Sequence, residues 1–121
     1  MYFIILNLTK NYEQLLKCNI FICPSSIENS PNSLAEAQIL GVPSIASFVG
    51  GIPDMIEDKK TGLLYRFEEI EMLGVFICDV FEKKSLKELS INEIITAQKR
   101  HDINKNTADL INIYYKILDK R

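Results

Sequence analysis

The chain has 121 residues, of which 47% are hydrophobic and 25% charged, the balance of one soluble globular domain and not of a disordered tail or a coiled coil. Its formal net charge of −2 provides no basic field for a polyphosphate backbone, so we do not expect a nucleic-acid partner. No apolar run approaches the ~18 residues of a spanning helix, so we expect a cytoplasmic protein with at most peripheral membrane association.

The beginning of the chain predicts a βαβ unit. Residues 1–6 are apolar without a basic flank and are typical of a strand, and residues 12–16 predict a short helix that returns from it. The segment 19–23 contains the unbroken apolar stretch Ile20-Phe21-Ile22 and is stopped by Pro24, which indicates a strand buried on both faces. Strands of this kind favour a parallel sheet.

The alternation of strands and helices continues to residue 65. Ser30 is predicted to cap a helix that has Pro31 in its first turn and ends at Gly41. Four further segments are predicted in chain order: a strand at 44–47, a short helix that Pro53 opens, a turn at 58–62 and a strand at 63–65.

Everything beyond Phe67 predicts helix. Residues 90–93 match a capping box, and two stripes at helical spacing, within 70–81 and within 110–118, are interpreted as ordinary core faces. The whole pattern predicts an α/β fold, a partial Rossmann-like open parallel sheet of about four strands with flanking helices and a helical tail.

Two glutamates flank the predicted start of the helix after the strand at 19–23, where open α/β sheets place their ligands. The free amides of Asn32, Ser33 and Leu34, with the helix dipole, favour an anion such as a diphosphate. Glu28 can accept hydrogen bonds from a sugar beside that anion, and Glu36, almost two turns into the helix, from a ribose. Spacing alone leaves open that Glu28 is a solvated loop acid and Glu36 a surface acid of the helix.

No metal site is expected. The cysteines Cys18, Cys23 and Cys78 form no CxxC pair and are interpreted as structural thiols. The single His101 has no second histidine and no clustered cysteines to complete a ligand set.

Five motifs follow one another in a fixed order: a strand ending in Pro-Ser at 18–25, the E-x7-E pair, a helix with a Gly-x-Pro stop and a strand at 36–47, a Gly-Gly segment at 50–56, and Thr-Gly-Leu-Leu at 61–64. In these motifs the chain resembles the carboxyl-terminal, donor-binding domain of the retaining glycosyltransferases of family 4, which have the two-domain GT-B fold. The resemblance weakens after Tyr65.

The resemblance implies a donor site built from one catalytic residue, Glu28, and six donor-binding residues: Ser30, Asn32, Ser33, Glu36, Gly50 and Gly51. Glu28 would lie near the donor sugar, Glu36 would bind the ribose, and the backbone amides of the serines and asparagine would bind sugar and phosphate. The two glycines would line the cleft, because a backbone without side chains admits a ligand closely. They are equally consistent with a tight turn between strand and helix, and both interpretations can hold together.

Complete members of that family also have an amino-terminal acceptor domain and a basic pair that neutralises the departing diphosphate. We expect this chain to begin after both, since Lys59, Lys60 and Arg66 fall elsewhere and are interpreted as solvated charges. Residues 1–121 would then be a single truncated nucleotide-sugar-binding domain, with the sheet and donor site at 1–66 and the helical tail at 67–121.

The resemblance implies transfer of a sugar from a nucleoside-diphosphate sugar to an acceptor, with retained configuration and without a metal or other cofactor. Three hypotheses stay open: a fragment of a hexosyltransferase, inactive alone and completed by a separate acceptor-domain chain; a non-catalytic nucleotide-sugar-binding module; or a structural remnant that forms homo-oligomers. Self-association is expected in any case, because an uncovered strand at 1–6 and the stripe at 110–118 would expose apolar surface.

Overall fold

Three parallel strands form the central sheet of the computed structural model, which describes residues 11–82 and 86–120. The strands lie side by side in chain order: β1 (Phe21–Cys23), β2 (Ser44–Ser47) and β3 (Leu63–Tyr65). Ile45 of β2 lies opposite Ile22 of β1 on one side and opposite Leu63 of β3 on the other. The predicted α/β fold with an open parallel sheet is confirmed, while the predicted strand at 1–6 lies outside the described residues.

The sheet is covered on both faces. The strands β1 and β3 are apolar, whereas β2 also buries Ser44 and Ser47, whose hydroxyls donate to backbone carbonyls. All four residues of β2 are buried. Because successive residues of a strand point to opposite faces, Ala46 joins Phe21 and Cys23 in one apolar cluster. Its neighbour Ile45 joins Tyr65 in a second cluster on the other face.

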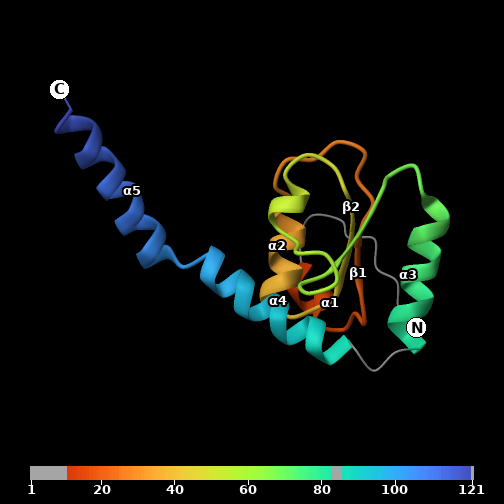
Figure 1. Cartoon of the computed structure of the whole chain (residues 1–121). Coiled ribbons are helices and arrows are strands. Elements are labelled where there is room, and N and C mark those ends of the chain that lie inside the picture. Colours follow the sequence, from red (N-terminus) through yellow and green to blue (C-terminus); the bar gives the residue numbers. More distant parts are fainter. Residues whose placement is uncertain (1–10, 83–85, 121) are drawn as a thin grey trace.

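Helices form the two outer layers, as Figure 1 shows. One side carries α1 (Asn11–Leu15), α2 (Asn32–Ile39) and α4 (Leu86–Arg100), and the other carries α3 (Ile70–Glu82). α2 packs against both α1 and α4, and α3 contacts β3. The predicted flanking helices are therefore present on both faces.

The ends of α2 differ in how well local signals predicted them. The helix begins at Asn32, with Pro31 at the cap position and no side-chain cap. The prediction that Ser30 caps it is wrong, because the Ser30 hydroxyl donates to Met55 Sδ instead, at 3.5 Å. The predicted stop at Gly41 is confirmed: its φ is +71°, and its amide bonds to the Gln38 carbonyl as the chain leaves the helix.

The predicted capping box at 90–93 is also wrong, since these residues lie in the middle of α4. Their side chains make tertiary contacts. The Ser90 hydroxyl donates to the Gly41 carbonyl at 2.6 Å, and Glu93 Oε1 accepts from the Ser44 amide at 3.0 Å. Both bonds join α4 to the connection between α2 and β2.

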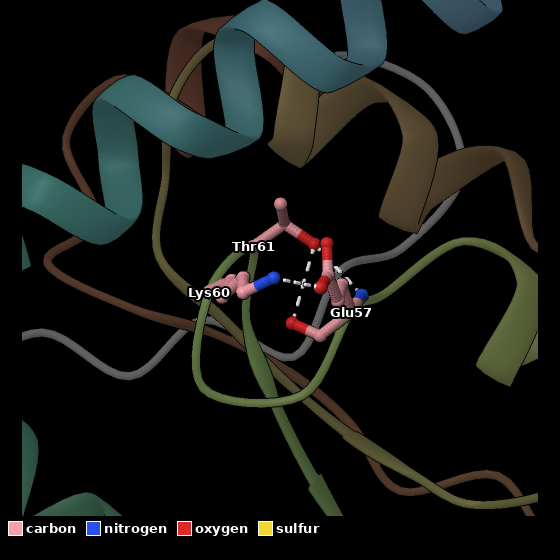
Figure 2. A network of polar contacts seen from close by, with 3 residues as sticks. All are labelled: Glu57, Lys60 and Thr61. Atoms are coloured by element: carbon pink, nitrogen blue, oxygen red, sulfur yellow. Dashed lines mark hydrogen bonds and ion pairs between the residues drawn. The ribbon is translucent and has the colours of Figure 1, made fainter.

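A short polar network closes the turn before β3 (Figure 2). The Glu57 amide donates to Thr61 Oγ1 at 2.8 Å, and Lys60 Nζ contacts Glu57 Oε1. Lys59 has a φ of +65°, and Asp58 Oδ1 accepts from the Leu64 amide at 2.9 Å. The predicted turn at 58–62 is confirmed.

The last helix, α5 (Ile103–Leu118), extends away from the rest of the molecule in Figure 1. Asp102 caps it by accepting hydrogen bonds from two backbone amides of the first turn, both at 3.0 Å. Every residue of α5 is exposed, with Ile113 at 52% and Ile117 at 50%. The interpretation of this stripe as a core face is therefore wrong. Within the described ranges, no helix has the length and apolar character needed to cross a membrane.

Candidate functional site

The loops that leave the carboxyl ends of the three strands share one edge of the sheet, because the strands are parallel. Open α/β sheets bind ligands at this edge. The loop after β1 spans residues 24–31, the loop after β2 spans 48–51, and the segment after β3 spans 66–69. Every predicted site residue lies either in the first two loops or on α2.

The first two loops touch each other through their backbones. A Cβ on Gly50 would lie 1.5 Å from the Glu28 carbonyl oxygen, and a Cβ on Gly51 would lie 2.1 Å from that of Asn29. Gly50 also has a φ of +52°, a conformation that side chains disfavour. The absence of side chains at these two positions is therefore what lets the loops approach each other.

A buried serine fixes the loop after β1. Ser47, the last residue of β2, is fully buried, and its hydroxyl donates to the Ser25 carbonyl at 2.5 Å. This bond spans from one strand to the beginning of the neighbouring loop. It holds the path of the chain that leads to Glu28.

The Glu28 side chain is half-buried, and its Oε1 accepts a hydrogen bond from the Asn29 amide at 3.1 Å. A carboxylate offers about four lone-pair positions, so this bond leaves Glu28 able to accept hydrogen bonds from a ligand. The Ser30 hydroxyl is occupied by Met55. The Ser30 hydroxyl can still accept a hydrogen bond, and its backbone amide can donate one to a ligand.

The start of α2 adjoins this loop. The amides of Leu34 and Ala35 donate to the Pro31 carbonyl at 3.1 and 3.2 Å, so the prediction that the Leu34 amide is free is wrong. The amides of Asn32 and Ser33 precede these first bonds of the helix. Glu36 is exposed and follows these two residues by four and three positions, which places all three on one helix face. The structure thus joins Glu28 with the glycine loop and places Glu36 further along α2.

Sequence reasoning missed a group of polar contacts that anchors the segment after Gly51. This segment contains the short 3-10 helix η1 (Ile52–Asp54). The Met55 carbonyl accepts from Gln38 Nε2 at 3.0 Å and from Arg100 Nη1 at 2.9 Å. Arg100 Nη2 also donates to the Asp54 carbonyl. Burial lowers the pKa of the Arg100 guanidinium, and the Asp54 carboxylate opposes that shift. Arg100 on α4 thereby holds the end of the glycine loop.

A cavity at the same edge was also missed. It has a volume of about 530 Å³ and is lined by Phe48, Val49, Arg66, Phe67, Glu68 and Glu69. Phe48 is 58% exposed and Phe67 41% exposed. In the sequence a phenylalanine follows each of two strands by one or two positions, but the exposure of these side chains is seen only in the structure.

A second cavity, of about 570 Å³, lies between α3 and α4 beside the turn at 58–62. This turn precedes β3, so the cavity is near the amino end of that strand and away from the predicted site. Within residues 11–82 and 86–120, no cluster of three or more histidine, cysteine, aspartate or glutamate side chains could hold a metal ion.

A buried acid lies at the amino edge of the sheet. Glu93 is 1% exposed. Its Oε1 accepts from the amide of Ser44, the first residue of β2, and its Oε2 has no hydrogen-bond partner. Burial raises the pKa of Glu93 to about 8, and the bond from Ser44 only partly offsets this. Glu93 thus lies at the edge opposite the candidate site and supports the contact of α4 with the sheet.

Comparison with known proteins gives consistent results. The family of glycosyl transferases group 1 matches residues 2–110. The chain is 29% identical over 100 residues to an uncharacterised 41.2 kDa protein in the cps region of Klebsiella pneumoniae, a match that covers 82% of this chain and 26% of that protein. It is 38% identical over 56 residues to alpha-maltose-1-phosphate synthase of Mycolicibacterium smegmatis, over 46% of this chain and 14% of the synthase.

Solved structures show the same fold at lower identity. Sucrose-phosphate synthase from Thermosynechococcus elongatus aligns with a TM-score of 0.78 at 22% identity, over 89% of this chain and 27% of that one. Anabaena HepE in complex with UDP-glucose aligns with a TM-score of 0.70 at 20% identity, over 83% and 29%. The chain thus spans about a quarter of the length of these proteins. Because the family match extends over residues 2–110, the chain belongs to the glycosyl transferases group 1 family, and its parallel sheet with flanking helices matches part of the GT-B fold.

Proposed function

We propose that this chain is the donor-binding portion of a retaining glycosyltransferase, which moves a sugar from a nucleoside-diphosphate sugar to an acceptor. The observation that carries the proposal is the backbone contact of Gly50 and Gly51 with Glu28 and Asn29, at the carboxyl edge of the sheet and beside the start of α2. Membership of the glycosyltransferase family supports it, as does the UDP-glucose complex of the structurally similar HepE.

Each group at this edge has a chemical role in the proposal. The amides of Ser30, Asn32 and Ser33 bind the sugar and the diphosphate, helped by the positive end of the α2 dipole. Glu36, on the same helix face, accepts hydrogen bonds from the ribose hydroxyls. Glu28 accepts hydrogen bonds from the donor sugar and acts as the catalytic residue.

Transfer requires that the charge on the leaving diphosphate be stabilised as the bond to the sugar breaks. Helix amides supply part of this stabilisation. Because the chain covers 26% of its Klebsiella relative, we propose that a part of the enzyme outside residues 1–121 binds the acceptor and adds the remaining positive charge. The proposed domain, with its donor site at 1–66 and a helical tail at 67–121, then binds the donor but does not transfer the sugar alone.

Calorimetric titration with UDP-glucose and GDP-mannose tests the donor site. Glu36→Ala should weaken binding by about 1–3 kcal/mol, because a carboxylate that accepts ribose hydrogen bonds is lost. The matched control is Glu71→Ala, which removes another exposed helical glutamate, on α3, and should leave the Kd unchanged. Equal effects of the two substitutions, or no binding by the wild type, would contradict the proposal.

A further inference from the structure

The segment that contains the two site glycines forms one hydrogen-bonded unit, the 49–55 unit. The Ile52 amide donates to the Val49 carbonyl at 3.1 Å, and the Asp54 amide donates to the Gly51 carbonyl at 3.2 Å. The Met55 amide closes the last turn by donating to the Ile52 carbonyl at 2.9 Å. Because each turn of the unit is bonded to the one before it, a restraint at Met55 also restrains the glycines.

Three other parts of the fold contact this unit at Met55, which is 4% exposed. The Met55 Sδ accepts from the Ser30 hydroxyl in the loop after β1. The Met55 carbonyl accepts from Gln38 Nε2 on α2 at 3.0 Å and from Arg100 Nη1 on α4 at 2.9 Å. A carbonyl oxygen has two lone pairs, so these two bonds fill its acceptor capacity. The Met55 end of the unit is therefore held by α2 and α4 together.

Arg100 contacts this unit from outside the predicted donor site. It is the last residue of α4, a helix that carries none of the proposed ligand contacts. Its Nη1 and Nη2 donate to the successive carbonyls of Met55 and Asp54, which suits the fixed fork of a guanidinium. We propose that Arg100 is a positioning residue of the donor site, which sets the glycine loop against Glu28 by holding the far end of the 49–55 unit.

The position of this unit distinguishes the two halves of the donor. Gly50 and Gly51 meet the carbonyls of Glu28 and Asn29, on the side of the site that is proposed for the donor sugar. The groups proposed for the diphosphate and the ribose lie mostly on α2, which also packs against α1 and the sheet. A shift of the 49–55 unit should therefore disturb the sugar more than the nucleotide. This division rests on the proposed function, whereas the restraint on the unit rests on the hydrogen bonds alone.

Calorimetric titrations of the full chain with UDP-glucose and with UDP test this division. Arg100→Gln should raise the Kd of UDP-glucose about tenfold, the equivalent of one hydrogen bond to the sugar, and the Kd of UDP by less than about twofold. Ser90→Ala is the matched control, because it removes another bond from α4, to the Gly41 carbonyl. It should lower the urea midpoint and leave both Kd values unchanged. Equal changes in the two Kd values of Arg100→Gln, or the same pattern in both variants, would overturn the proposal.

Amide hydrogen exchange of the ligand-free chain tests the restraint itself. In Arg100→Gln the amides of Ile52, Asp54 and Met55 should exchange about tenfold faster relative to those of β2, whereas Ser90→Ala should leave these relative rates unchanged. Arg100→Lys, which keeps a cation but not the fork, should give a smaller increase and replaces Arg100→Gln if that variant does not fold. Unchanged relative rates in the Arg100 variants would refute the restraint. Faster exchange in a chain whose wild type binds no UDP-glucose would keep the restraint and refute both the donor role and the proposed function.

Discussion

Replacing Glu93 by glutamine is expected to stabilise the chain at neutral pH and to remove most of its pH dependence between about pH 4.5 and 8. Glutamine has nearly the same shape and can still accept the hydrogen bond from the Ser44 amide. The second oxygen of Glu93 has no hydrogen-bond partner, so an amide nitrogen in its place loses no existing hydrogen bond. Its buried N–H donors cost the same at every pH, so they do not alter the pH dependence. The main change is the loss of an ionisable group from a buried position.

The magnitude follows from the pKa of Glu93, which burial raises from 4.5 to about 8. Between these values the native state holds a proton that the unfolded state has released, so the unfolding free energy falls as pH rises, by about 1.4 kcal/mol per pH unit. The stabilisation that comes from the proton bound to Glu93 in the native state is complete below pH 4.5 and is lost by pH 8. From pH 5 to pH 7.5 the wild type should therefore lose about 3 kcal/mol that Glu93→Gln retains.

Urea denaturation of both proteins at pH 5 and pH 7.5 measures this difference. Comparing the two proteins cancels the contributions of all other titrating groups. Glu88→Gln, at an exposed position of the same helix, should show no such effect. If the difference in unfolding free energy between Glu93→Gln and the wild type were the same at both pH values, the reasoning would be refuted.

Three further predictions concern the site scaffold and α5. Gly50→Ala should abolish donor binding and lower the unfolding free energy by more than about 1 kcal/mol, because φ is +52° and the new Cβ would overlap a carbonyl. Gly74→Ala, in open space on α3, should raise the unfolding free energy by about 0.5–1 kcal/mol. Thermal melts of the two variants measure both changes. Arg100→Gln should destabilise the fold by about 1–3 kcal/mol by removing hydrogen bonds to the carbonyls of Asp54 and Met55 at the end of η1, and unchanged urea midpoints would contradict this. The chain should sediment as a dimer or a larger species, and Ile113→Lys should weaken this self-association, since Ile113 is 52% exposed on α5. A stable wild-type monomer at micromolar concentration would contradict this prediction.

The sheet was predictable because its signals are local. The run Ile20 to Cys23 ends at Pro24 and the run Ser44 to Ser47 begins after Pro43, and the apolar residues of both suit a strand buried on both faces. The stop of α2 at Gly41 depends on one positive φ, which glycine adopts readily. Each of these features was fixed by a few neighbouring residues.

The errors occurred where distant residues compete with local ones. Ser90 and Glu93 have the spacing of a capping box, but their hydrogen bonds go to Gly41 and Ser44. Ser30 could have capped α2, yet its hydroxyl donates to Met55. These partners are known only once the sheet and α4 are packed together.

The candidate site was predictable only in part. The order of Glu28, Glu36 and the paired glycines identified the loops, and parallel strands brought those loops to one edge. The cavity between Phe48 and Phe67 could not be inferred, because it depends on the register of β2 against β3. The anchor at Arg100 likewise depends on the path of α4 past η1.

Mapping the amide shifts of the chain on addition of UDP-glucose tests the central claim most directly. The account predicts that the largest changes occur at the amides of Ser30, Asn32, Ser33, Gly50 and Gly51, with smaller changes in the segment after β3. Changes confined to the cavity between α3 and α4, or the absence of any change at millimolar UDP-glucose, would contradict it.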